Sequence, residues 1–294
     1  MGSLVRCIQS IKFISELAHE VIVIDDCSDV PVEEPLRRSF CNGFPARLSV
    51  VRQERNYGPI VARNTIAQLA TRELILSLDD DAVLFESEGV KLAVEIMRRD
   101  KRVGAVAFAQ ADAMGKSWPE FMQPCPMKYP CYVAAFIGFA TVLRRDIFLS
   151  LGGYRSRFHY YGEEKEYSLR LLDAGYHVVY LPDALVAHLP DPSGRSMQRY
   201  LRHVIRNDCL GAIYNEPFPM MMLSIAVRLY RYFRMKRNSQ VEDPGGFAWI
   251  INGLLSSLPE VWRERRPLRW ATFRRWRNIK KSWPPYYRVD EIIA

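Results

Sequence analysis

Hydrophobic positions along the chain fall into two patterns, continuous apolar runs and apolar residues at helical spacing. Residues 3–17 place Leu and Ile along one side of a helix. Continuous apolar runs, rich in β-branched residues and typical of buried strands, occupy residues 20–26, 48–53, 73–78 and 102–109. Helical patterns follow at residues 56–70, 87–100 and 162–175, and most of the chain beyond residue 193 is also expected to be helical. Strands that alternate with helices predict an α/β fold with a parallel sheet.

The basic charge of the chain lies in its last quarter. The net charge is +8 over 294 residues. Residues 228–294 carry fifteen Lys and Arg against six Asp and Glu, a net charge of +9, whereas residues 1–227 are close to neutral. We therefore expect an α/β domain at residues 1–215 and a basic, aromatic-rich helical extension at residues 216–294. Six cysteines without CxxC spacing fit a reducing cytoplasm, and no apolar run reaches the roughly 18 to 20 residues that span a membrane.

Two of the apolar runs end in carboxylates. Asp25 and Asp26 follow one, and Asp79, Asp80 and Asp81 follow another. Ligands of open α/β sheets gather at the carboxyl ends of strands, and adjacent carboxylates are costly to bury without a cation. Because side chains alternate along a strand, Asp79 and Asp81 are expected to point the same way. The alternative is an acidic turn that caps the next helix.

Five segments occur in an order that resembles family 2 inverting glycosyltransferases with the GT-A fold. The segments, between about residues 3 and 215, read VIVIDDCSD, NYGPIVARN, LILSLDDDAVL, LSLGGYRSRFHYYGEEKEYSLRLLDAG and LVAHLP. The resemblance implies a GT-A-like, predominantly parallel sheet flanked by helices. It also implies transfer of a sugar from a nucleotide-diphosphate sugar, with inversion at C1. The sequence does not identify the acceptor; the candidates are a lipid-linked sugar or a polysaccharide in cell-envelope synthesis.

The same resemblance implies a divalent metal and a set of donor-binding residues. Mn²⁺ or Mg²⁺ would be held by Asp79, Asp81 and His188, and oxygen ligands suit these hard ions. Taken alone, His188 would be a packed loop histidine. The implied donor-binding residues are Asp25, Asp26, Asn56, Arg63, Asp79 and Asp80.

The nucleotide contacts have a physical basis and a plainer alternative. A carboxylate such as Asp26 is a suitable acceptor for a base N–H, and arginine is a usual partner of phosphate. Alternatively, Asp26 forms an Asx turn with Ser28 and Arg63 is a solvated helix residue.

The catalytic base is expected in GEEKEY. Glu164 stands where the family has the aspartate of an E-D motif, and Glu163 precedes it. The resemblance implies that this carboxylate takes the proton of the acceptor hydroxyl. The alternative is a solvated acidic first turn favoured by the helix dipole.

One departure from the family concerns the sheet. Members open with a strand that packs centrally, whereas this chain starts inside the helix that follows. A gap would leave ladder groups unpaired. A catalytically silent GT-A-like scaffold is therefore a second hypothesis.

The extension, residues 216–294, suits an anionic membrane surface, which predicts a peripheral protein at the inner face of the cell membrane. Nucleic acid is the competing partner, disfavoured because it leaves the acids of the first half unexplained.

Overall fold

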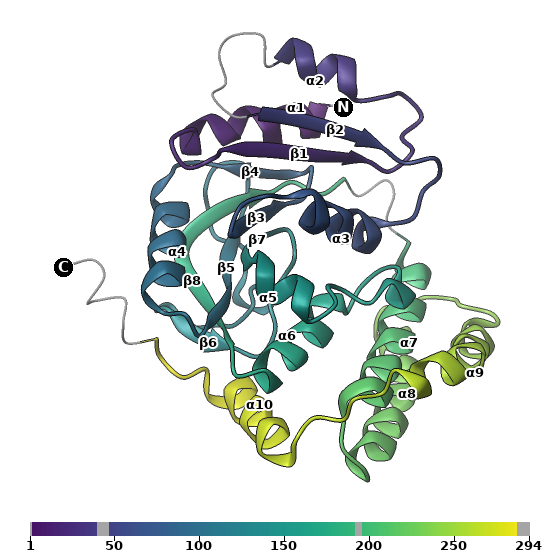
Figure 1. The fold of residues 1–294 in the computed structure, drawn as a ribbon. Coiled ribbons are helices and arrows are strands. Elements are labelled where there is room, and N and C mark those ends of the chain that lie inside the picture. The colour runs from purple at the N-terminus through teal and green to yellow at the C-terminus, as the bar shows by residue number, and fades with distance from the viewer. Residues whose placement is uncertain (1, 40–46, 192–195, 287–294) are drawn as a thin grey trace.

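The computed structural model describes residues 2–39, 47–191 and 196–286 of the chain. Near the N-terminus two parallel strands form a small sheet of their own (Figure 1). They are β1 (Glu20–Asp25) and β2 (Arg47–Arg52), with helices α1 (Gly2–Ser10) and α2 (Glu33–Ser39) beside them. The predicted first helix is confirmed, with a 3₁₀ turn that continues it over Ile11–Ile14.

The larger sheet has six strands and is mixed. They are β3 (Leu74–Leu78), β4 (Ala82–Leu84), β5 (Val103–Ala111), β6 (Cys131–Val133), β7 (Ala140–Arg144) and β8 (His177–His188). The order is β3-β7-β5-β8-β4, with β6 paired to β8. Only the β5–β8 pair of these described strands is parallel. The predicted α/β fold is confirmed, but the predicted predominantly parallel sheet is wrong. The antiparallel strands β4, β6 and β7 have only three to five residues, and they lack the helix-strand alternation that signals a parallel crossover, so the sequence did not reveal them.

The two sheets are not hydrogen-bonded to each other within the described residues. A gap in the sheet was expected from the sequence, and β1 and β3 indeed belong to separate sheets. Side chains of the N-terminal part connect them: the Thr71 backbone N–H donates to Glu20 at 2.7 Å, the Cys7 thiol donates to the Asp79 carbonyl at 3.4 Å, and the Leu84 N–H donates to the Ser10 hydroxyl at 3.1 Å. Apolar packing also crosses the division, because Ile8 and Val21 share a buried cluster with Val106 of β5.

Alternation along β5 sends its side chains to two faces of the sheet. Val106 and Phe108 pack with α4 (Glu88–Arg99), whereas Ala105 and Ala107 face a second cluster. That second cluster includes buried side chains of α3 (Pro59–Leu69), α5 (Arg145–Ser150) and α6 (Glu163–Asp173). The sequence of β5, apolar except for Gln110, follows from this burial on both faces.

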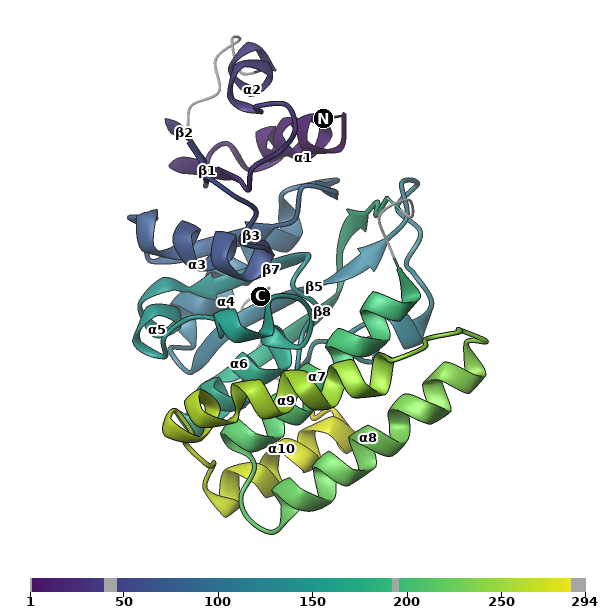
Figure 2. The ribbon, with the colours of Figure 1, turned by 90° about the vertical axis from the view of Figure 1, so that its right-hand side faces the viewer.

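The helices after α6 continue this second face. They are α7 (Met197–Asn215), α8 (Met220–Asn238), α9 (Gly246–Arg263) and α10 (Trp270–Ser282) (Figure 2). The predicted boundary at residue 215 falls at the end of α7, yet Tyr214 and Ile250 belong to the same buried cluster as Tyr180 of β8. The basic extension is thus built onto the core of the α/β part. Across the described residues, none of the helices is both long and apolar enough to cross a membrane.

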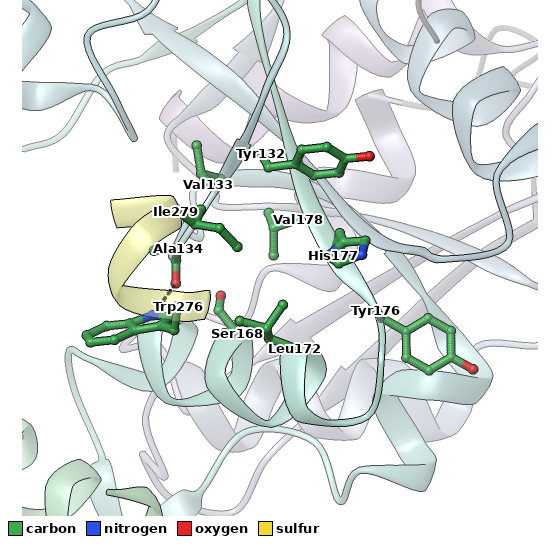
Figure 3. A pocket seen from close by; sticks show the side chains of 10 residues that line it. All are labelled: Tyr132, Val133, Ala134, Ser168, Leu172, Tyr176, His177, Val178, Trp276 and Ile279. Atoms are coloured by element: carbon green, nitrogen blue, oxygen red, sulfur yellow. Dashed lines mark hydrogen bonds between the residues drawn. The ribbon is translucent and has the colours of Figure 1, made fainter. Parts of the chain in front are cut away.

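Helix α10 packs against α6 and the segment after β6. The Trp276 indole N–H donates to the Ala134 carbonyl at 3.0 Å, and Ile279 faces Leu172 of α6 (Figure 3). The space left between these elements has a volume of about 10 Å³. That volume is about the size that holds one water molecule, so it is a packing gap and not a ligand site.

Candidate active site

A single arginine lies at the centre of the site. Arg63 projects from α3, its side chain is 13% exposed, and its two terminal nitrogens reach Asp79 at 2.6 Å and Glu163 at 3.0 Å. Glu164 lies 4.0 Å away. Burial alone would lower the pKa of Arg63, but the three carboxylates outweigh burial and raise it. Arg63 is therefore a permanent cation that ties three elements together, and it is not the solvated residue considered as the alternative. A contact of Arg63 with the base or phosphate of a donor stays a prediction.

The two glutamates at the start of α6 are not equivalent. Glu163 is buried, and its Oε2 atom has no hydrogen-bond partner among the described residues. Glu164 accepts a hydrogen bond from the Gly138 backbone N–H at 3.1 Å, and its side chain is 18% exposed. Burial and the charge of Glu163 raise the pKa of Glu164 to about 8, against the opposing effect of Arg63. The alternative of a solvated acidic turn does not fit this burial.

The three aspartates lie in a tight turn and not on an extended strand. The Ala82 N–H donates to the Asp79 carbonyl at 3.0 Å, so residues 79–82 form the turn between β3 and β4. The strand alternation expected for Asp79 and Asp81 therefore does not apply. Asp79 pairs with Arg63, Asp80 is exposed, and Asp81 approaches His188 at 3.6 Å.

His188 is held in one orientation at the end of β8. Its Nδ1 lies 2.5 Å from the Gln110 side-chain oxygen, and the Gln110 amide nitrogen donates to the Met122 carbonyl. That donation fixes the orientation of the Gln110 amide, so the Gln110 oxygen faces His188 Nδ1 and accepts its proton. The lone pair of the His188 ring is therefore on Nε2, the atom that faces Asp81. The imidazole also stacks on Phe139 and Trp118, at 4.8 and 5.4 Å between ring centres.

The Asp81–His188 pair fits part of a divalent metal site. Two ligands each about 2.1 Å from an ion, at about 90 to 120° to each other, lie about 3.0 to 3.6 Å apart. The observed 3.6 Å is at the upper end of this range. No group of three His, Cys, Asp or Glu side chains that could hold a metal occurs in the described part of the chain. Asp79, predicted as a third ligand, is turned to Arg63 instead.

The carboxylates predicted at the nucleotide base have protein partners. Asp25 is buried and accepts from the Ser28 N–H at 2.8 Å and from Arg52 at 2.5 Å. Burial would raise the pKa of Asp25, but these hydrogen bonds outweigh burial and lower it. The Ser28 N–H that an Asx turn of Asp26 would use is therefore bound by the neighbouring Asp25.

Asp26 instead accepts from two consecutive backbone N–H groups, those of Tyr57 and Gly58, at 2.8 and 2.7 Å. These contacts fix the loop that leads into α3. Asn56 is exposed immediately before them.

Three contributors to the site were missed from the sequence: Gln110, Gly138 and Phe139. Gln110 carried a usable signal, because it is the polar residue within the otherwise apolar run of β5 and a buried polar group needs a partner. Phe139 joins the two halves of the site, since its carbonyl accepts from the Asp79 N–H at 2.8 Å while its ring stacks on His188. Nothing in the sequence marks Gly138 or Phe139 for these contacts.

The model of glycosyl transferase family 2 matches residues 2–149, and the chain belongs to this family. It is 25% identical over 226 residues to an N-acetylglucosaminyltransferase of Bradyrhizobium diazoefficiens, covering 70% of this chain and 45% of that protein. The chain spans less than half the length of the curated relatives it matches.

Solved structures show the GT-A glycosyltransferase fold. TarS of S. aureus with UDP-GlcNAc has a TM-score of 0.60 at 15% identity, covering 90% of this chain and 79% of that one. The mannosyltransferase PcManGT of Pyrobaculum calidifontis, solved with GDP-Man and Mn²⁺, has a TM-score of 0.55 at 17% identity and covers 88% and 72%.

The raised pKa of Glu164 predicts a pH-dependent cost in stability. The folded state keeps the Glu164 proton up to about pH 8, whereas the unfolded chain releases it near 4.5. Stability is therefore lost as pH rises between these values. Glu164→Gln should leave the thermal midpoint near pH 4 unchanged and raise it by about 2 °C or more at pH 8.5.

Glu166→Gln on the same helix is the matched control. Burial would raise the pKa of Glu166, but Arg170 and Arg155 lower it, so its charge stabilises the fold above pH 4.5. This variant should lower the midpoint at pH 7. A Glu164→Gln variant with the parent's midpoint at both pH values contradicts the assignment.

Proposed function

We propose that the protein transfers a sugar from a nucleotide-diphosphate sugar to an acceptor hydroxyl, with inversion at C1 and with a bound Mn²⁺ or Mg²⁺. The observation that carries the proposal is the carboxyl of Glu164, with its pKa near 8, at 4.0 Å from the Arg63 cluster that also holds Asp79. A general base works best with a pKa near the working pH. The UDP and GDP sugars of the neighbouring structures supply the donor class, and membership of family 2 supplies the reaction class.

In the proposed step, the Glu164 carboxylate takes the proton of the acceptor hydroxyl as its oxygen bonds to C1. The bond from C1 to the diphosphate oxygen breaks on the opposite face, and the nucleoside diphosphate leaves with the electron pair. Arg63 keeps Glu163 and Asp79 in place on either side of the base. The charge of Glu163 raises the basicity of Glu164.

On the donor side, Asp81 and His188 would hold the metal. A divalent ion supplies positive charge that stabilises the departing diphosphate. Gln110 keeps the His188 lone pair directed at Asp81, and Asp26 fixes the loop beside Asn56 where we place the nucleotide. The ordered machinery on both sides favours catalysis over a silent scaffold.

We also propose that the extension binds an anionic membrane surface through α8. Residues 222, 223, 226, 227, 230 and 233 lie on one face of this helix at helical spacing and are exposed. Their side chains are apolar or aromatic, and Arg234 and Arg237 continue the same face. Figure 2 shows α8 at the outer side of the helical layer. An apolar face edged by arginines is typical of helices that lie on anionic lipid.

Nucleic acid is less favoured as the partner of the basic extension, since part of its charge is used inside the fold. Arg228 pairs with Glu216 at 2.6 Å, and Arg265 donates to the carbonyls of Ile213 and Glu216. These arginines stabilise the junction of α7 and α8.

Substitution of the base tests the reaction. Glu164→Gln keeps the size of the side chain and its hydrogen bond from Gly138 but takes no proton, so transfer should fall by about 10² to 10⁴-fold. Binding of UDP with Mn²⁺, measured by calorimetry, should persist. Glu34→Gln, at an exposed carboxylate of α2 outside the site, should transfer at nearly the parent rate. Transfer by Glu164→Gln at the parent rate would exclude Glu164 as the base.

Removal of the metal ligands tests the donor site. Asp81→Asn and His188→Ala should each weaken Mn²⁺-dependent UDP binding by about tenfold or more. Glu34→Gln serves again as the control, and the thermal midpoints of the variants check their folding. If both variants bind UDP with the parent's dependence on Mn²⁺, the metal lies elsewhere.

Flotation with vesicles tests the α8 face. Because α8 shares the core, surface substitutions are used instead of truncation. The full chain should float with vesicles that contain anionic lipid, and Leu223→Glu with Tyr230→Glu should abolish this, while Phe121→Glu at a distant exposed ring should not. High salt should weaken binding. Equal flotation of the double variant and the parent would show that α8 is not the membrane contact.

A further inference from the structure

Six rings from three separate segments gather beside the two glutamates of α6. The aromatic cluster consists of His159, Tyr160, Tyr161, Tyr200, His203 and Trp249, from the loop before α6 and from α7 and α9. Tyr161 meets Tyr200 edge to face with ring centres 5.2 Å apart, and His203 lies 5.1 Å from Trp249. Tyr160 connects the two pairs, at 5.8 Å from Tyr161 and 6.4 Å from His203.

The loop that supplies three of these rings is held in a costly conformation. His159 and Tyr161 have φ angles of 61° and 67°, a region that non-glycine residues seldom adopt. The Asn207 side-chain amide on α7 donates to the carbonyls of Phe158, Tyr160 and Tyr161, at 2.9, 2.5 and 2.8 Å. Backbone strain of this kind persists where surrounding contacts enforce it, and it is common at ligand-binding sites. The rings are thus fixed in place before any ligand arrives.

The aromatic cluster adjoins the start of α6 along the chain and contacts the loop before α3. Tyr161 is separated from Glu163 by Gly162 alone, so it lies at the start of the helix that carries the base. At the other side, the His159 ring packs against Gly58, where an added Cβ would lie 3.2 Å from two ring atoms. The Gly58 N–H in turn binds Asp26. A molecule bound on these rings would be next to Glu164 and beside the loop assigned to the donor.

The cluster combines flat apolar faces with polar edges. Tyr161 and Tyr200 are 37% and 36% exposed. The Arg199 guanidinium lies 4.5 Å from the Tyr160 ring centre, and Arg206 lies 5.5 Å from that of Trp249. Burial, followed by the charges of Arg206 and Arg199, lowers the pKa of His203 to about 4, so this imidazole is neutral at pH 7.

A pyranose has the complementary chemistry, because its C–H groups form an apolar face and its hydroxyls form a polar rim. We infer that the aromatic cluster is the acceptor subsite and binds the terminal sugar of a carbohydrate acceptor, free or attached to a lipid. This rests on the proposed function, which places the acceptor hydroxyl at Glu164. The exposed face of α8 is a separate surface, formed by other residues.

Binding of the full chain to immobilised saccharides tests the inference. The probes are neutral di- to tetrasaccharides of glucose, N-acetylglucosamine, mannose and galactose, applied with UDP and Mn²⁺ present. The parent should bind at least one of them, and Tyr161→Ala and Tyr200→Ala should weaken that binding by about tenfold. Tyr161→Phe keeps the ring and should retain most of it. Tyr129→Ala removes a 42% exposed tyrosine outside the cluster and should bind like the parent.

Failure of this inference is distinguishable from failure of the proposed function. UDP binding is measured in the same variants, and thermal midpoints show that they fold. Parent protein that binds UDP but no saccharide, or Tyr161→Ala that binds saccharide like the parent, overturns the acceptor subsite alone. Saccharide binding that depends on Tyr161 without any binding of UDP overturns the donor assignment and leaves the acceptor subsite standing.

Discussion

The site depends on one cation shared among three carboxylates. Arg63 joins α3 to the β3–β4 turn through Asp79 and to α6 through Glu163. Without its charge, the repulsion and desolvation of these acids would oppose the packing of the three elements. A single positive charge does not satisfy all three, and the remaining cost raises the pKa of Glu164. Burial at this junction and the charge of Glu163, which outweigh the opposing charge of Arg63, set the basicity that the proposed chemistry needs.

A second anchor acts through the loop before β7. Gly138 donates to Glu164, while the next residue, Phe139, accepts from the backbone of Asp79 and stacks on His188. Glu164, the proposed base, and the Asp81–His188 pair are therefore positioned by adjacent residues of one segment. A displacement of this loop would disturb the acceptor and donor sides together. This coupling explains why buried backbone contacts, and not exposed charged groups alone, shape the site.

Most of the elements could be predicted from the sequence, because apolar periodicity reports burial directly. The periodicity located β1, β3, β5 and α6, and the ordered motifs located Asp81, His188 and Glu164. Pairing direction was not predictable, since the short reversed strands leave no pattern of their own. The hydrogen-bond and ion-pair partners of each acidic side chain were also not predictable from the sequence. No pattern in the sequence indicated that Arg63, four residues into α3, turns inward to carboxylates that lie 16 and 100 residues away in the sequence.

The central claim is that the Arg63 cluster leaves Glu164 protonated near neutral pH, and a titration of its carboxyl group tests this most directly. Side-chain carboxyl resonances of ¹³C-labelled glutamate would be followed by NMR from pH 4 to 10, with Glu164→Gln to assign the signal. The account predicts that this carboxyl titrates near pH 8. Titration near 4.5, the ordinary value for glutamate, would contradict it.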